Sequence, residues 1–204
     1  MAAERIIVTP ETREEAFSRC RDIIAGGGVV AYPTDTFYGL GADPRNPRAV
    51  RRLFAVKGRS ERRPVLLLIA DADEAAAWVS SLPAQARLLM ERFWPGPLTL
   101  VLPARHDVLP ELTGGTGRIG LRVPDSELTR SLLRFLGSGL TGTSANRSGG
   151  SDPRSADDVL DALGDRIDLV LDGGPSRAVL PSTVVDAAED PPRVLRAGAV
   201  DIGS

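Results

Sequence analysis

Hydroxyl groups and a carboxylate are concentrated in the segment 32–41, whose sequence is YPTDTFYGLG. The segment follows an apolar run that predicts a buried strand over residues 29–32. In open α/β sheets, ligands gather beyond the carboxyl ends of strands, so this segment is a candidate site for a polar ligand. A turn in which the Thr and Asp side chains bond their own backbone explains the same composition. Both interpretations stay open on this segment alone.

Cations are concentrated in a second segment, where KGR at 57–59 and RRP at 62–64 separate a helical pattern from an apolar strand pattern. The chain has 25 Lys and Arg residues, and only Lys57 is a lysine. A compact ammonium group suits a phosphate oxygen where a planar guanidinium does not fit. Chance also explains a single lysine. Because Arg59 lies two residues after Lys57, the two are predicted to form a pair of cations that face one pocket.

Two further strand ends carry short polar side chains. The segment 141–150, TGTSANRSGG, offers hydroxyls, an amide and backbone N–H groups to a phosphate or carboxylate. It lacks the Gly-Lys-Ser/Thr of a P-loop and the spacing of a Rossmann fingerprint. PSTVVD at 181–186 and VLRAG at 194–198 each pair a polar residue with a short strand. Arg118 and Arg122 lie four apart in a strand pattern, which predicts one shared face and makes Arg122 a candidate carboxylate clamp.

The composition excludes several classes of protein. The single Cys rules out an intramolecular disulfide framework, and the single His rules out His-cluster metal sites. A Ser-His-Asp triad would depend on His106 alone, which lies in an expected exposed loop. No apolar run is long enough for a membrane span, and the N-terminus does not resemble a signal peptide. We therefore expect a cytoplasmic protein without a membrane partner.

Charge is unevenly distributed, although the net charge is only −2. Residues 45–63 carry eight cations and one acid, whereas residues 152–190 carry ten acids and three arginines. Such a basic stretch creates a local positive field that gathers anions. A solvated helix face explains the same run.

Strand and helix patterns alternate along the 204 residues, which predicts an α/β domain with a twisted, mixed, partly parallel sheet flanked by helices. A capping box of Thr12 and Glu15 and a cap at Ser126 are expected to begin two of the helices. Helices are predicted at 12–25, 47–56, 73–79, 83–93, 126–136 and 156–163, and strands at 6–8, 29–32, 65–69, 98–102, 119–123, 140–143, 169–171, 183–185 and 194–195.

Seven motifs in order resemble the YrdC family of threonylcarbamoyl-AMP synthases: PTDTFYGLG, KGR with RRP, WPGPLT, LRVP, TSAN with SGG, PSTVVD and LRAG. The resemblance implies one YrdC-like domain over 1–204, with a core of about 8–198 and no second C-terminal domain. Members of that family make L-threonylcarbamoyladenylate and pyrophosphate from L-threonine, bicarbonate and ATP, with Mg²⁺ carried by the ATP. The product feeds threonylcarbamoyl-adenosine formation in tRNA. The resemblance thus implies tRNA or double-stranded RNA and a downstream tRNA threonylcarbamoyl-transferase machinery as partners.

The resemblance also implies roles for single residues. Lys57 and Arg59 match the pair that meets the ATP phosphates and are the expected catalytic residues. The expected ATP-binding residues are Lys57, Arg59, Arg63, Arg118, Gly142, Thr143, Asn146 and Arg196. The expected threonine-binding residues are Thr36, Arg122, Ser144 and Ser182. Leu68 stands where many longer relatives have a His, which removes one threonine contact. No side-chain nucleophile is required, because positioning and charge neutralisation can drive adenylation of a carbamate.

Three alternatives remain open at this point. A carbamoyl-adenylate-forming domain would use carbamoyl phosphate in place of threonine. An RNA-binding module would use residues 45–63 to bind phosphates without chemistry, and its binding would weaken steeply with salt. An inactive structural paralogue would bind neither ATP nor threonine.

Overall fold

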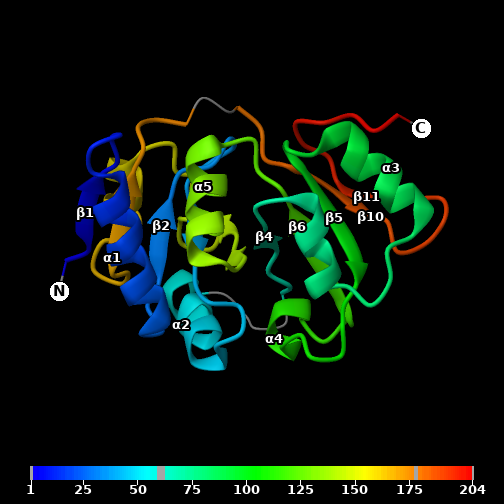
Figure 1. Ribbon diagram of the computed structural model, residues 1–204, viewed down its shortest axis with the longest axis horizontal. Coiled ribbons are helices and arrows are strands. Elements are labelled where there is room, and N and C mark those ends of the chain that lie inside the picture. Colours follow the sequence, from blue (N-terminus) through cyan, green and yellow to red (C-terminus); the bar gives the residue numbers. More distant parts are fainter. Residues whose placement is uncertain (1, 59–62, 177–178, 204) are drawn as a thin grey trace.

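Eleven short strands form two mixed sheets in the computed structural model, which describes residues 2–58, 63–176 and 179–203. The predicted α/β class, with mixed strands flanked by helices, is confirmed. The strands, however, are divided between two sheets rather than gathered in one. Figure 1 shows the first sheet beside α1 (Arg13–Ala25) and the second beside α3 (Ala84–Phe93).

The first sheet has five strands, and its core is covered by α1 and α5 (Glu127–Leu136). Its first three strands run parallel and the last two pairings are antiparallel. Buried Phe17 and Cys20 of α1 share one cluster with Leu132 and Leu133 of α5. In spatial order the strands are β1 (Glu4–Ile7), β9 (Leu169–Asp172), β2 (Val30–Tyr32), β3 (Gly39–Gly41) and β8 (Thr143–Ser144).

The second sheet has six strands and carries most of the remaining core. Its pairings alternate between antiparallel and parallel. In spatial order the strands are β11 (Arg193–Arg196), β10 (Thr183–Asp186), β5 (Leu98–Pro103), β6 (Arg118–Arg122), β4 (Leu67–Leu68) and β7 (Leu140–Thr141). The other helical segments are α2 (Pro47–Lys57), the 3-10 helix η1 (Ala72–Ala77), α4 (Pro110–Thr113) and α6 (Ala156–Leu163).

Helix α2 begins and ends where its sequence directs. The Asn46 side chain accepts two backbone N–H groups of the first turn, and Pro47 occupies a position where no hydrogen-bond donor is needed. Gly58 ends the helix in the left-handed conformation, with φ of 59°. The helix therefore stops at Lys57, and its buried Val50 and Leu53 face the core.

Several local predictions are wrong. Thr12 does not form a capping box with Glu15, because its hydroxyl donates to the Ile7 carbonyl at 2.6 Å and accepts the Thr9 N–H. The helix predicted over 73–79 is the 3-10 helix η1. Strand β4 keeps only two residues of the predicted 65–69 run. Strand β3 and the short helix α4 were not predicted.

The strand predicted over 140–143 is broken at Gly142. Strand β7 before it pairs with β4 of the six-stranded sheet, and β8 after it pairs with β3 of the five-stranded sheet. A Cβ atom at Gly142 would lie 2.7 Å from Leu66 Cδ1 and 2.8 Å from Leu68 Cγ. A side chain at position 142 would therefore force these leucines to move where the chain passes from one sheet to the other.

The basic run over 45–63 is partly neutralised by acids that are distant in sequence. Arg51 pairs with Glu111 at 3.3 Å, and Arg52 pairs with Asp168 at 2.6 Å. The described part of the run is therefore less positive than its sequence indicates. Among the helices of the described ranges, none has the length and apolar character needed to cross a membrane.

Candidate functional site

A cavity of about 660 Å³ is lined by residues of both sheets. Gly39 and Ser144 come from the five-stranded sheet, while Thr99 and Arg122 come from the six-stranded sheet. Eight of the sequence-predicted site residues line this one cavity: Thr36, Arg118, Arg122, Gly142, Thr143, Ser144, Ser182 and Arg196. Strand ends that are far apart in the chain thus converge on one site.

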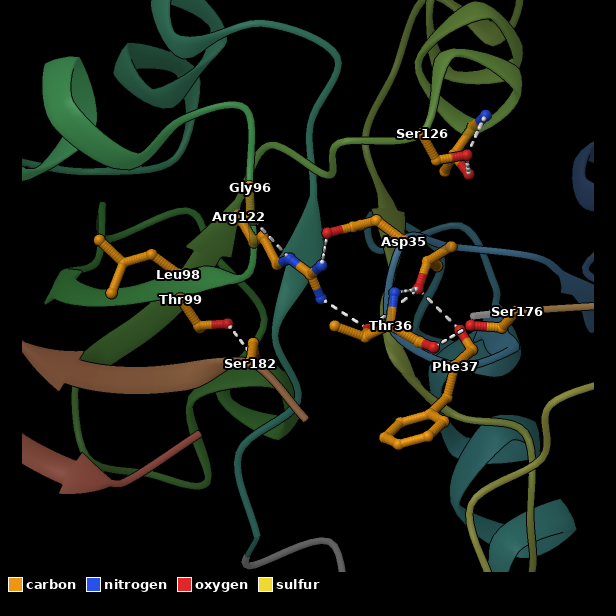
Figure 2. A network of polar contacts seen from close by, with 12 residues as sticks. Asp35, Thr36, Phe37, Gly96, Leu98, Thr99, Arg122, Ser126, Ser176 and Ser182 are labelled. Carbon is orange, nitrogen blue, oxygen red and sulfur yellow. Dashed lines mark hydrogen bonds and ion pairs between the residues drawn. The ribbon is translucent and has the colours of Figure 1, made fainter. Parts of the chain in front are cut away.

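Arg122 is the buried cation of this cavity, with only 5% of its side chain exposed. Figure 2 shows its guanidinium held from three directions. Nε donates to the Gly96 carbonyl at 2.9 Å, Nη1 donates to Thr36 Oγ1 at 3.0 Å, and Nη2 donates to Asp35 at 2.5 Å. Burial lowers the pKa of Arg122, and the charge of Asp35 opposes that effect. A guanidinium has five N–H groups, so two remain without a partner among the described residues.

Thr34 and Thr36 form a tight turn, and the Thr36 side chain lies beside Arg122 (Figure 2). The Thr34 hydroxyl donates to the Phe37 carbonyl at 2.7 Å and accepts the Thr36 N–H at 3.1 Å. The two threonine hydroxyls are 3.0 Å apart. Both interpretations of the segment 32–41 therefore hold, since it is a self-bonded turn and also part of the cavity wall. Asp35 departs from the turn interpretation, because it pairs with Arg122.

Lys57 lies behind the loop that follows β8. It is 4% exposed, and its Nζ donates to the Ser144 carbonyl at 2.5 Å and to the carbonyl and side-chain oxygens of Asn146 at 3.0 Å each. Asn146 Oδ1 also accepts from the Ser144 hydroxyl at 2.8 Å. Lys57 thus fixes Ser144 at the end of β8 and the loop that follows it, although it does not itself line the cavity.

The other end of the wall is built on β6, β10 and β11. As predicted, Arg118 shares the cavity face with Arg122. It pairs with Asp186 and with Glu189, and these carboxylates raise the pKa of Arg118. Arg196 donates to the Ser182 carbonyl at 2.7 Å, and burial lowers its pKa.

Residues 22–198 match the sequence profile of the Sua5/YciO/YrdC family, which is described as "Telomere recombination". The chain belongs to the Sua5/YciO/YrdC family. The predicted family resemblance is therefore confirmed.

Individual members of the family agree with this assignment. The chain is 40% identical to the threonylcarbamoyl-AMP synthase of Thiobacillus denitrificans, over 93% of this chain and 99% of that protein. It is 38% identical to the enzyme of the same name from Bacillus subtilis, over 93% of this chain but only 55% of that protein. A crystal structure of P. abyssi Sua5 complexed with L-threonine has a TM-score of 0.90 and 35% identity, over 97% of this chain and 58% of that one. The chain thus spans little more than half the length of two of these three family members.

Some of the residues predicted for the site of this chain lie outside the cavity wall. Asn146 is buried within its loop, where its Nδ2 donates to the carbonyls of Gly150 and Ser151. Arg63 is exposed and does not line the cavity. Arg59 lies outside the described residues. Leu68, at the position noted for a His in longer relatives, is a buried part of the wall.

Sequence reasoning missed two residues of the site in this family member. Asp35 was noted as a carboxylate but received no role, and its pairing with Arg122 joins positions 87 apart. Thr99 lies in the WPGPLT motif and received no role of its own, yet its hydroxyl is 2.9 Å from that of Ser182. A signal for Asp35 was available, since a buried arginine needs an anionic partner.

Proposed function

We propose that the chain forms L-threonylcarbamoyladenylate and pyrophosphate from L-threonine, bicarbonate and ATP. One observation carries the proposal: a single cavity is lined by a buried guanidinium with hydroxyls beside it and by a glycine- and hydroxyl-rich strand end. The first set suits an amino acid, and the second suits a nucleotide. Relatives of 38% and 40% identity that carry the name of this activity support the same proposal.

The amino acid would bind at Arg122. Its carboxylate would take the two N–H groups of the guanidinium that have no partner among the described residues. Thr36, Ser144 and Ser182 line the same cavity and would hold the rest of the threonine by their hydroxyls.

The nucleotide would occupy the wall formed by Gly142 and Thr143, with Arg118 and Arg196 as its further cationic contacts. Lys57 and Asn146 would act through the loop that they brace, and Lys57 would add positive charge behind it. Arg59 and Arg63 would neutralise the phosphates. Mg²⁺ bound to ATP would offset further phosphate charge, and it is expected to keep mostly phosphate and water oxygens as ligands. That expectation suits this wall, where the carboxylate of Asp186 is paired with Arg118.

The proposed chemistry needs no side-chain nucleophile. The threonine ammonium first loses one proton to solvent or to a phosphate oxygen. The resulting amine attacks bicarbonate, a C–N bond forms, and the bicarbonate hydroxyl leaves as water with a second proton from the nitrogen. An oxygen of the resulting carbamate attacks the α-phosphorus of ATP, and the bond to the β-phosphate bridging oxygen breaks to release pyrophosphate. Such a transfer relies on alignment and on preorganised positive charge.

We place this reaction in the cytoplasm, upstream of an enzyme that transfers the threonylcarbamoyl group to tRNA. The test uses purified protein with ATP, bicarbonate and L-threonine, with pyrophosphate release and the mass of the adenylate as readouts. The proposal predicts release that requires threonine and bicarbonate together. If pyrophosphate release does not need threonine but requires carbamoyl phosphate, the chain forms carbamoyl-adenylate instead. If no pyrophosphate is released, the proposed activity is wrong.

A further inference from the structure

We infer that Thr34 is a positioning residue that acts through the Thr36 hydroxyl and selects a ligand with an ammonium group next to a carboxylate on Arg122. The inference rests on the proposed function, in which this ligand is L-threonine. It deepens that function by assigning the direction of one hydrogen bond in the cavity and the residue that sets it.

The direction follows from proton counting in the turn. A threonine hydroxyl has one proton to donate and two lone pairs that accept. The Thr34 proton goes to the Phe37 carbonyl oxygen at 2.7 Å, which can only accept. In the 3.0 Å contact between the two hydroxyls, Thr36 is therefore the donor. The Thr36 backbone N–H also donates to Thr34 Oγ1, so Thr34 is held as the acceptor of both groups.

The Thr36 hydroxyl is consequently left with acceptor capacity alone. Its proton points to Thr34, and one of its lone pairs receives Arg122 Nη1 at 3.0 Å. One lone pair remains without a partner among the described residues, and Thr36 lines the cavity. A ligand atom that meets this oxygen must therefore be a donor.

An ammonium group is the ligand group for which this direction matters most. A ligand hydroxyl can donate or accept, and it would adapt to either direction of the Thr36 proton, whereas an ammonium can only donate. An α-amino acid carries both charged groups on one carbon. Its carboxylate can therefore take the free N–H groups of Arg122 while its ammonium reaches Thr36 Oγ1 beside them. The Asp35 carboxylate offsets the guanidinium charge, so this part of the site suits a zwitterion better than a simple anion.

The experiment compares the KM for L-threonine and for ATP in Thr34→Val, Thr34→Ser, Thr36→Val and the double variant. Thr34→Val removes the acceptor of the Thr36 proton, and we expect the KM for threonine to rise about tenfold, the effect of one hydrogen bond of ordinary strength. The KM for ATP should stay unchanged, and Thr34→Ser should restore the value for threonine.

The double variant separates positioning from a general effect on the turn. If Thr34 acts through Thr36, Thr34→Val adds nothing in a Thr36→Val background. The inference is overturned if the double variant raises the KM for threonine by the product of the two single effects. It is also overturned if Thr34→Val leaves this KM unchanged.

A second substrate tests the ammonium assignment. L-2-aminobutanoate keeps the ammonium and lacks the hydroxyl, so Thr34→Val should weaken its competition with threonine by the same factor. If its competition is insensitive to Thr34→Val, the donor is the ligand hydroxyl and the assignment is wrong. If the unsubstituted protein releases pyrophosphate without needing threonine, the proposed function itself is refuted. This result differs from every outcome that refutes only the role of Thr34.

Discussion

The carboxylate of Asp35 holds the guanidinium of Arg122 at 2.5 Å across 87 positions of sequence, at a place where both side chains are nearly excluded from water. The second oxygen of Asp35 is buried and has no hydrogen-bond partner among the described residues. The pair therefore serves to orient and neutralise the arginine, and its removal should affect both stability and ligand binding.

Asp35→Ala should lower the free energy of unfolding by about 3–5 kcal/mol, because it leaves a buried guanidinium without its counter-charge. Urea denaturation measures the change. Asp107→Ala is the matched control, since the Arg105–Asp107 pair has a similar contact of 3.0 Å but both side chains are more than 40% exposed. That control should change stability by at most about 1 kcal/mol. Equal losses in the two variants would show that burial does not distinguish the pairs.

Lys57→Ala should lower threonine-dependent pyrophosphate release by about a hundredfold or more, because the charge behind the Ser144 loop is lost and carbonyl oxygens of that loop lose their donor. Lys57→Arg should fail to restore it, since a planar fork does not match acceptors arranged for a point charge. Arg51→Ala, on the same helix and in a half-exposed pair with Glu111, is the control and should retain activity. A near-normal rate in Lys57→Ala would remove this residue from the catalytic machinery.

Gly142→Ala should destabilise the protein by about 1–3 kcal/mol, because the new methyl group would lie 2.7 Å from Leu66 and 2.8 Å from Leu68 in a packed wall. Thermal unfolding measures the loss. Gly26→Ala is the control, as Gly26 has an ordinary helical φ of −74° and its nearest neighbours lie at 3.4 Å. If both variants unfold at the same temperature, the crossing between the sheets does not depend on a glycine.

The buried thiol of Cys20 should make the free energy of unfolding depend on pH at alkaline pH. Burial raises the pKa of the Cys20 thiol from 9.0 to about 12. Between these values the unfolded chain loses the proton while the folded chain keeps it, so stability should fall as pH rises, by up to about 1.4 kcal/mol per pH unit from this group. Well below pH 9, where both states keep the proton, the group should contribute no slope.

Cys20→Ala removes that contribution. Burial also raises the pKa values of Tyr32 and Tyr38, and the charge of Cys20 adds to the rise at Tyr32, so the difference between the two stability curves reports Cys20 together with its coupling to Tyr32. The variant should lose stability less steeply than the parent above pH 9. Parallel curves would contradict the assigned burial of the thiol.

Local signals were sufficient for elements that end on strong caps. The helices predicted over 47–56 and 126–136 correspond to α2 and α5. The structure shows Asn46 and Ser126 capping their first turns, and Gly58 and Gly137 ending them in the left-handed conformation. The break at Gly142 could not be read in the same way. The strand predicted over 140–143 runs through it, and only the positions of Leu66 and of Leu68, which lies in the six-stranded sheet, show why a glycine stands there.

Motif order was sufficient for the family, and the cavity contains most of the residues that it implied. Long-range pairing was the part that sequence could not supply. Lys57 matched the reasoning that a point charge has a special role, but the structure directs its ammonium to oxygens of a loop about 90 positions away. A buried arginine needs an anionic partner, but nothing near Asp35 in sequence identifies Arg122 as the residue it pairs with.

The passage of the chain from β7 to β8 has a mechanical consequence for ligand binding. At Gly142 the two sheets are tied together by one residue of backbone, and the cavity opens beside this tie with Ser144 on one sheet and Ser182 next to the other. A ligand that contacts both serines adds a further link between the sheets, beside contacts such as that of the Tyr32 hydroxyl with the Thr141 carbonyl, and resists their sliding past each other. Occupancy should therefore slow amide hydrogen exchange in β8 and β10 together, even though these strands belong to different sheets.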